Sequence, residues 1–192
     1  MRPASTFRLI DRRGAIAYLA PMRLLDILIH PDPRLKKVCD PVADPTSVKG
    51  LSEDMLATMY NAPGVGLAAP QIGVNARLLV MDCAGKDAPP EPLAMVNPEI
   101  VWSSAELNEH EEGCLSIPDQ YAMVTRPAAV GVRWTSVEGE PLERTFDGLW
   151  ATCVQHEIDH LNGKLFIDYL GAVKRQLITQ KMKKLKRERA KA

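Results

Sequence analysis

The sequence predicts an α+β protein in which antiparallel or mixed strands pack around a central metal-binding helix, with a further helix at the C-terminus. Three observations lead to this prediction. A helical segment ending at Gly163 contains the pattern His-Glu-x-x-His, short apolar runs separated by turn residues precede it, and a basic amphipathic segment follows it. At 192 residues, with 46% hydrophobic and 25% charged residues, the chain has the size and composition of one globular domain.

The formal net charge of zero hides a strong asymmetry along the chain. Residues 172–192 contain nine Lys or Arg and one acid, whereas residues 22–171 contain eleven basic and twenty-two acidic residues. We therefore divide the chain into an N-terminal extension (1–21), a catalytic domain (22–171) and a basic C-terminal helix or tail (172–192). An acidic body with a basic tail predicts that the tail, rather than the body, meets polyanions.

Residues 1–21 are rich in Arg and poor in acids. We interpret them as a poorly ordered extension, or as residues upstream of a working start at Met22. The alternative is a transit peptide, which would place the protein in an organelle matrix. The four cysteines show no C-x-x-C pairing, which favours a reducing compartment and hence the cytoplasm. No apolar run approaches the roughly 18 residues of a membrane span, so no membrane partner is expected.

The first elements are predicted from turn residues and apolar periodicity. Asp32-Pro33 begins a short helix that runs to about Cys39. A second helix is predicted with Ser52 as its N-cap and Pro63-Gly64 at its end. The glycine-rich stretch 64–73 follows, and we expect a tight backbone there that another chain can approach closely.

The strands are predicted from short apolar runs bounded by turn residues. They cover 76–83, 95–102, 122–125, 128–137 and 142–146, the last two joined in a hairpin by the turn at 138–140. The acidic segment 105–117 runs into a turn around Cys114. The last element, about 170–190, is predicted as a helix with one apolar side, formed by Leu170, Val173, Leu177, Ile178, Met182 and Leu185.

The central helix, capped by Asp147 and ended by Gly163, carries the chemistry-bearing pattern. Residues four apart lie on one helix face, so His156 and His160 can both reach a single metal ion. Glu157 points about 100° away around the helix axis and is placed to act as a general base. The alternative is an ordinary core or solvated helix that carries two histidines. A third ligand elsewhere in the chain decides between the two.

A catalytic metal site needs three protein ligands and one open position. No histidine follows His160, and Asp168 follows it too closely to leave a helix between them. His30 and His110 are predicted to be surface residues rather than ligands.

The thiols are the remaining candidates for the third ligand. Cys39 and Cys83 are predicted to be small buried hydrophobes, the usual fate of a free cysteine. Cys114 lies in a glycine-containing, acid-flanked segment, and Cys153 lies one helical turn before the first histidine.

Three blocks of sequence together resemble the peptide deformylase family, in its bacterial form with a C-terminal helix. They are Gly64-Val65-Gly66-Leu67-Ala68-Ala69-Pro70-Gln71, then Glu112-Gly113-Cys114-Leu115-Ser116, then Gln155-His156-Glu157-Ile158-Asp159-His160. The resemblance covers about Ile27 to Leu170. Three blocks in the right order are far more specific than His-Glu-x-x-His alone.

The resemblance implies both a site and a reaction. It implies that Cys114, His156 and His160 bind the metal, that Glu157 is the general acid and base, and that Gln71 and the backbone N–H of Leu115 hold an oxyanion. The implied reaction is hydrolysis of the N-formyl group from the N-terminal formylmethionine of newly made polypeptides, with release of formate. The implied cofactor is one divalent metal ion, Fe(II), with Zn or Ni as substitutes.

The resemblance also implies a substrate pocket and partners. Substrate binding is assigned to Val65, Gly66, Gly113, Leu149, Thr152 and Cys153, although a purely structural role for Cys153 fits the sequence equally well. Tyr121 stands where many bacterial members have Arg, so contacts to the peptide differ there. The partners are N-formylmethionyl nascent peptides and, through the basic C-terminal helix, the ribosome. The alternative for that helix is a solvated charged end. We expect a monomer.

Two other functions compete with this interpretation. One is a metallopeptidase that cleaves internal amide bonds, and the other is a non-catalytic ribosome-associated module in which the metal only stiffens the fold. A cysteine ligand upstream of the helix, instead of a downstream Glu or His, argues against the metallopeptidase. The presence of Glu157 and Gln71 argues against the non-catalytic module.

Overall fold

A computed structural model describes residues 23–85 and 88–189 of the chain. The N-terminal extension predicted at 1–21 lies outside the described residues. Within them the fold contains three α-helices, short 3-10 turns and two antiparallel sheets. The predicted α+β class is confirmed. None of the described helices is both long and apolar enough to cross a membrane.

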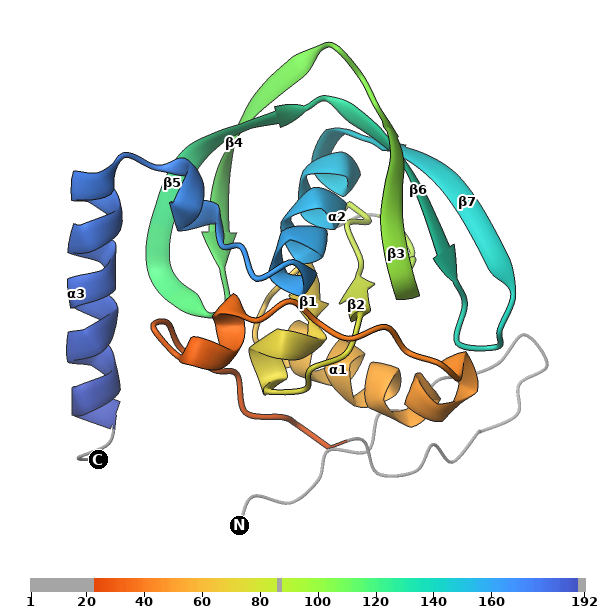
Figure 1. The fold of residues 1–192 in the computed structure, drawn as a ribbon, viewed down its shortest axis with the longest axis horizontal. Coiled ribbons are helices and arrows are strands. Elements are labelled where there is room, and N and C mark those ends of the chain that lie inside the picture. The colour runs from red at the N-terminus through yellow and green to blue at the C-terminus, as the bar shows by residue number, and fades with distance from the viewer. Residues whose placement is uncertain (1–22, 86–87, 190–192) are drawn as a thin grey trace.

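The larger sheet curves around one side of the molecule (Figure 1). Its five strands follow the order β1-β2-β3-β6-β7, with every neighbouring pair antiparallel. Their bounds are Gly66–Ala68 (β1), Leu78–Met81 (β2), Leu93–Ser103 (β3), Ala129–Thr135 (β6) and Pro141–Asp147 (β7). The predicted hairpin at the C-terminal end of the sheet is confirmed by the pairing of β6 with β7.

The helix α2 (Gly148–Leu161) lies in the middle of the fold, enclosed by both sheets (Figure 1). Ten of its fourteen residues are buried, so nearly its whole surface is packed. It begins after Asp147, as predicted, but that side chain makes no capping hydrogen bond within the described part of the chain. Gly163 adopts a positive φ of 71° just beyond the helix end, where a Cβ would lie 2.6 Å from the Lys36 carbonyl oxygen. Glycine is therefore required there.

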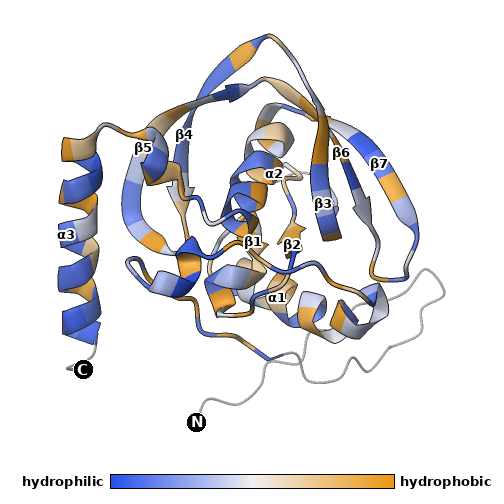
Figure 2. Cartoon of the chain, viewed as in Figure 1, coloured by the Kyte–Doolittle hydropathy of each residue, from blue (hydrophilic) through white to orange (hydrophobic). Residues whose placement is uncertain are grey.

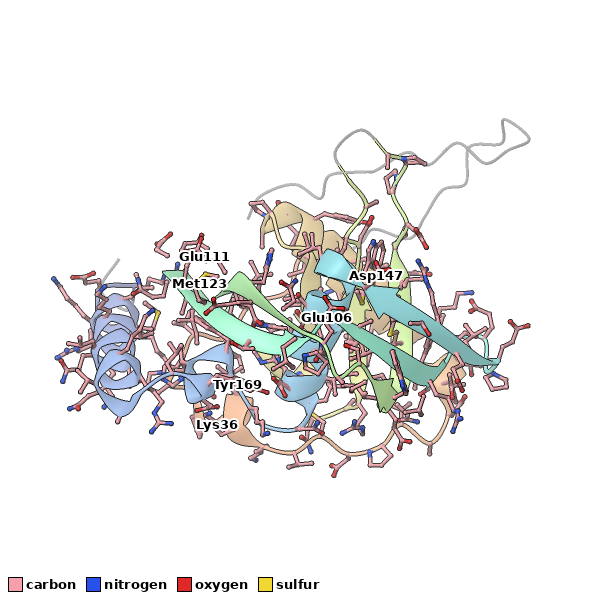
Figure 3. The ribbon with its side chains drawn as sticks, turned by 90° about the horizontal axis from the view of Figure 1, so that it is seen from above. Lys36, Glu106, Glu111, Met123, Asp147 and Tyr169 are labelled. Atoms are coloured by element: carbon pink, nitrogen blue, oxygen red, sulfur yellow. The ribbon has the colours of Figure 1, made fainter. Side chains whose placement is uncertain are left out.

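The second sheet pairs β4 (Leu107–Cys114) with β5 (Ile117–Pro127). Figure 3 shows Glu111 and Met123 next to each other across this ribbon, as their register requires. The register shifts between Glu112 and Cys114, which is the mark of a β-bulge. A bulge re-aims the side chains beside it, and here it lies directly before the cysteine of the second sequence block.

The helix α3 (Ala172–Arg189) lies at the edge of the molecule (Figure 1). Figure 2 shows it as mostly hydrophilic with a narrow hydrophobic stripe. Only Ile178 and Met182 are buried along it, and they join the cluster that includes Ile29, Leu35 and Phe166. The predicted apolar side is therefore wrong in part, because Val173 and Leu177 are 75% and 56% exposed.

Several predicted boundaries also need correction. The helix α1 runs over Lys49–Asn61, so it begins four residues earlier than an N-cap at Ser52 would place it. Ser52 is buried inside that helix, where its hydroxyl donates to the Lys49 carbonyl at 2.7 Å. The predicted helix at 32–39 is a 3-10 turn, Pro33–Lys36, capped by the Asp32 side chain. The acidic segment, for which no strand was predicted, forms the strand β4, and the predicted turn follows it at Leu115 and Ser116.

Candidate metal centre and its surroundings

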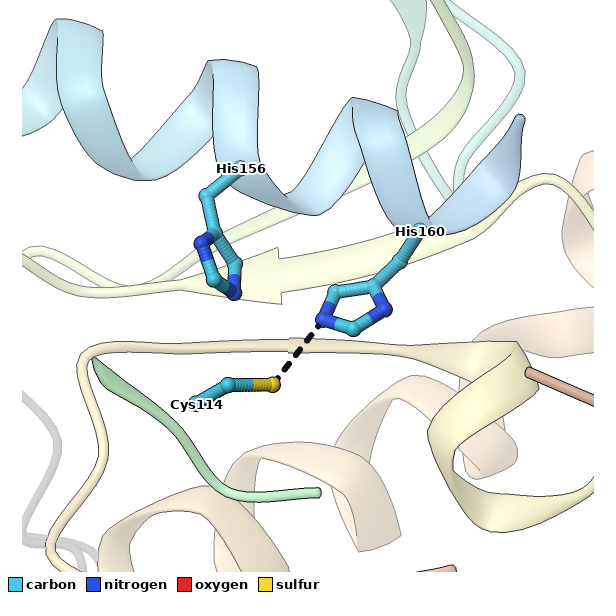
Figure 4. A group of neighbouring side chains, drawn as sticks. All are labelled: Cys114, His156 and His160. Atoms are coloured by element: carbon cyan, nitrogen blue, oxygen red, sulfur yellow. Dashed lines mark hydrogen bonds between the residues drawn. The ribbon is translucent and has the colours of Figure 1, made fainter. Parts of the chain in front are cut away.

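Three potential ligand atoms meet where the β4 bulge faces α2. The Cys114 sulfur and one ring nitrogen each of His156 and His160 all lie within 4.8 Å of one another. Figure 4 shows the three side chains converging. The Cys114 Sγ lies 3.2 Å from the His160 Nε2. The predicted trio is thus brought together, and Cys114, rather than Cys153, is the thiol beside both imidazoles.

The orientation of His156 is fixed by a carboxylate from β4. Its Nδ1 lies 2.8 Å from Glu112 Oε2, which leaves Nε2 for the cluster. Burial would raise the pKa of Glu112, but hydrogen bonds from His156 and Arg126 outweigh burial and lower it to about 2. Glu112 is therefore ionised and accepts the Nδ1 proton, so Nε2 is the nitrogen that faces the cluster and would bind a metal ion through its lone pair.

Glu157 is buried beside the cluster. It is only 4% exposed, and its Oε2 has no hydrogen-bond partner among the described residues. Burial raises the pKa of this carboxyl to about 7. A Cβ added at Gly66 would lie 2.4 Å from Glu157 Oε1, so the carboxylate rests directly against the β1 backbone. A carboxyl with a pKa near neutrality is suited to taking and returning a proton.

Gln71 faces the cluster with its amide nitrogen. Its Oε1 accepts from the Ala68 backbone N–H at 2.8 Å, which fixes the orientation of the amide group. Its Nε2 then lies 3.5 Å from Cys114 Sγ and 3.3 Å from Ser116 Oγ. A buried N–H donor is therefore held beside the place where the three ligand atoms converge.

A pocket of about 490 Å³ opens onto this cluster. Among its lining residues are all six predicted for substrate binding, namely Val65, Gly66, Gly113, Leu149, Thr152 and Cys153. Val65 and Leu149 lie at the rim, at 45% and 42% exposure, whereas Thr152 and Cys153 are buried in the wall. Tyr121 covers Gly113 so closely that a Cβ there would lie 2.7 Å from the ring.

The predictions for the remaining histidines and cysteines give mixed results. Cys39 and Cys83 are buried free thiols, as predicted. His110 is exposed at the mouth of the pocket. The prediction for His30 was wrong: it is 7% exposed, because α3 packs over it and Thr179 Oγ1 lies 3.0 Å from its Nε2.

Sequence reasoning missed Arg126, which pairs with Glu112 behind His156. One signal could have found it. Ala122, Val124 and Arg126 occupy alternate positions of β5 and are all buried, so an arginine occupies the inward face of the strand. An arginine on a buried face needs an acidic partner, and the acidic stretch of β4 could have supplied one.

The donor set fits a transition-metal ion. One thiolate and two imidazoles suit Zn²⁺ or Fe²⁺ and leave a fourth tetrahedral position open. Together with the buried carboxylate of Glu157, the arrangement is typical of a mononuclear metal-dependent hydrolase.

Comparisons with known proteins define the family. The sequence profile of polypeptide deformylase matches residues 24–176. A peptide deformylase of Rhodopseudomonas palustris is 50% identical over 166 residues, which cover 85% of this chain and 95% of that protein. The crystal structure of a peptide deformylase from Legionella pneumophila superimposes with a TM-score of 0.81 at 48% identity, covering 88% of this chain and 99% of that one.

A further structure adds a bound peptide. The class I type b peptide deformylase of Acinetobacter baumannii, described with Met-Ala-Ser bound, gives a TM-score of 0.73 at 37% identity, covering 78% of this chain and 99% of that one. The chain belongs to the peptide deformylase family, and it is an enzyme.

Proposed function

We propose that this enzyme hydrolyses the N-formyl group from the N-terminal formylmethionine of newly made polypeptides and releases formate. The single observation that carries the proposal is the buried carboxylate of Glu157, whose Oε2 has no hydrogen-bond partner in the described part of the chain, beside the Cys114, His156 and His160 cluster. The Met-Ala-Ser peptide bound to the Acinetobacter relative is the kind of product that this reaction would leave, and it supports a peptide substrate here too.

The metal centre would be held by the Cys114 thiolate and by one nitrogen each of His156 and His160. When bound, the ion would supply Lewis-acid polarisation and make water a better nucleophile near neutral pH. We propose Fe(II) as the native ion, with Zn or Ni as substitutes, because a mixed sulfur and nitrogen donor set accommodates all three.

Glu157 moves the proton in the proposed reaction. As the ionised carboxylate it takes a proton from the attacking water, and as the acid it gives that proton to the leaving methionine nitrogen. Its burial raises its pKa, which favours the protonated form once the proton has been taken from water. Its contact with the Gly66 backbone limits the positions that the carboxylate can adopt.

Gln71 and Leu115 stabilise the charge that develops on the formyl oxygen. The Gln71 amide N–H is aimed at the cluster because its oxygen is already bonded to Ala68. The backbone N–H of Leu115 follows the cysteine directly and supplies the second donor. Fixed donors that need no reorganisation are each worth about 3–4 kcal/mol of transition-state stabilisation in other hydrolases.

The pocket would receive the methionine side chain and the start of the peptide. Thr152 and Cys153 form its buried wall, and Val65 and Leu149 form its partly exposed rim. The Gly66 and Gly113 backbones would let the peptide approach closely, as in the addition of a strand. Tyr121 beside Gly113 would then contact the residues that follow the methionine.

The decisive experiment measures formate release by anaerobically prepared protein, alongside metal analysis. Formyl-Met-Ala should be deformylated, whereas acetyl-Met-Ala and a blocked peptide longer than a dipeptide should not be cleaved. Cleavage of an internal peptide bond would favour the metallopeptidase. Bound metal without turnover of either kind of substrate would favour the non-catalytic module.

The exposed basic face of α3 supports a further proposal, that the helix contacts ribosomal RNA. Lys183, Lys184 and Arg187 are exposed there, and the body of the protein is acidic. A cytoplasmic monomer bound to the ribosome in this way would meet formylated chains as they emerge from it. Replacing these three residues with Gln should weaken ribosome co-sedimentation at low salt and leave formyl-Met-Ala turnover unchanged. Unchanged co-sedimentation would contradict the proposed contact with ribosomal RNA.

A further inference from the structure

A buried ion-pair network lies behind His156, and the proposed reaction does not use its outer members. Its centre is Arg126 on β5, which is only 5% exposed. The guanidinium donates through Nε to Glu112 Oε1 at 2.5 Å and through Nη2 to Oε2 at 3.0 Å. Its Nη1 donates to Asp159 Oδ2 on α2 at 2.8 Å. Because the guanidinium is planar, three bonds to two carboxylates fix its orientation.

Tyr169 holds the outer side of this network. It lies in the 3-10 turn Phe166–Tyr169 between α2 and α3, at the position labelled in Figure 3. Its hydroxyl donates to Asp159 Oδ2 at 2.8 Å, and its ring centre lies 4.9 Å from the Arg126 Cζ. The network therefore joins β4, β5, α2 and the segment that leads to α3.

One oxygen connects the network to the metal centre. Glu112 Oε2 accepts from Arg126 Nη2 and from His156 Nδ1, at 3.0 and 2.8 Å. The guanidinium therefore sets the position of the oxygen that selects the imidazole tautomer. His160 provides a contrast, because its buried Nδ1 has no hydrogen-bond partner among the described residues.

We propose that Arg126 is a positioning residue for the metal centre, that it acts through Glu112 on His156, and that Asp159 and Tyr169 hold it in place. The inference rests on the proposed function only in taking the cluster as a metal site. A merely structural ion pair would contribute to folding alone. A positioning network contributes also to how tightly and in what geometry the ion is held.

The first test compares Arg126→Lys with Arg133→Lys in metal affinity. Lysine keeps the positive charge but cannot make the bidentate contact with Glu112. Arg133 is the control because it pairs with Glu143 on the exposed face of the β6–β7 hairpin, away from the cluster. Chelator competition on protein loaded with Zn²⁺ should show about 10- to 100-fold weaker binding for Arg126→Lys. The absorption spectrum of its Co²⁺ form should also change, and Arg133→Lys should match the wild type. Wild-type affinity and spectrum in Arg126→Lys would overturn the proposal.

The second test keeps the proposal falsifiable if Arg126→Lys does not fold. Tyr169→Phe removes only the hydroxyl, and Tyr60→Phe is its matched control. Both tyrosines are 47% exposed, and each donates to one carboxylate. Tyr169 donates to Asp159, and Tyr60 donates to Asp82. Tyr169→Phe should weaken Zn²⁺ binding several-fold, and Tyr60→Phe should not. Equal affinities in the two variants would contradict the role of Tyr169.

Both measurements omit the substrate, so their outcome is independent of deformylation. An enzyme that binds Zn²⁺ as predicted but releases no formate would overturn the proposed function and leave the network intact. Formate release by the wild type, together with unchanged metal affinity in Tyr169→Phe and Arg126→Lys, would support the proposed function and overturn the role of the network.

Discussion

The helix α2 carries the His-Glu-x-x-His pattern and α3 carries the basic segment, and the two helices differ sharply in burial. Ten of the fourteen residues of α2 are buried, against two of the eighteen in α3. On α2 every polar side chain near the cluster is held by packing or by a fixed partner, as Glu112 holds His156. On α3 every charged side chain except that of Lys186 is exposed. Substitutions on α2 should therefore change the chemistry, whereas those on α3 should change docking or stability.

The largest effect is expected at Glu157 on α2. Glu157→Gln preserves the shape of the side chain but removes the group that takes and returns the proton. The kcat for formyl-Met-Ala should fall by about 10²- to 10⁴-fold, the range that general acid–base catalysis contributes. Metal content should stay at the wild-type level, because the side chain is not one of the three ligands. A variant with near-normal kcat would remove Glu157 from its role.

A smaller effect is expected from crowding α2 through its neighbour β1. In Gly66→Ala the new Cβ would lie 2.4 Å from Glu157 Oε1 and 2.8 Å from Cys153 Sγ, so the carboxylate must move. Misplacement of a catalytic group by about 1 Å can cost about 10²-fold, so we expect a loss of kcat/KM of at least about tenfold. The control is Gly50→Ala within α1, where the added Cβ meets nothing within 4 Å. Equal activities in the two variants would contradict the close fit between β1 and α2.

The pH dependence should report the burial of Glu157. Burial raises the pKa of this carboxyl to about 7 in the metal-free protein, and a bound cation would draw it down. Because the ionised form is the base, kcat/KM should be level at alkaline pH. It should fall by about tenfold per pH unit below a midpoint at or under pH 7. The profile of metal-loaded enzyme between pH 5 and 9 checks this, and a rate that rises on acidification would contradict it.

The smallest effect on activity is expected on α3. Met182→Ala opens a cavity where α3 meets the body and should lower the free energy of unfolding by about 2–3 kcal/mol, the lower part of the range for buried truncations. Leu177→Ala, at a position 56% exposed, should cost less than about 0.5 kcal/mol. Both should keep wild-type kcat/KM while folded. Lost activity in folded Met182→Ala would show that α3 is not peripheral to the chemistry.

Much of α2 could be predicted from sequence because its information is local. The histidine spacing, Asp147 before the helix and Gly163 after it set its bounds, and the resemblance supplied Cys114 as the distant ligand. The network around Arg126 could not be predicted in this way. Its partners lie 14, 33 and 43 residues away along the chain. The pairing of β4 with β5 brings Glu112 to Arg126, and the packing of α2 and of the Phe166–Tyr169 turn against β5 brings the other two.

The incorrect predictions arose where the surrounding fold, and not the local sequence pattern, decides the structure. Ser52 has the chemistry of an N-cap, but its hydroxyl bonds within the helix because the chain enters α1 directly from the 3-10 turn Pro45–Val48. His30 looked like a surface residue until α3 covered it. The strand β4 was missed because six of its eight residues are polar or charged or glycine and five are exposed, so it shows no apolar alternation.

The coordination of the ion tests the central claim most directly. X-ray absorption on zinc-loaded protein should show one sulfur scatterer at about 2.3 Å and at least two imidazole nitrogens at about 2.0–2.1 Å. The sulfur signal should vanish in Cys114→Ala and persist in Cys153→Ala. A first shell of nitrogen and oxygen without sulfur in the wild type would contradict the account.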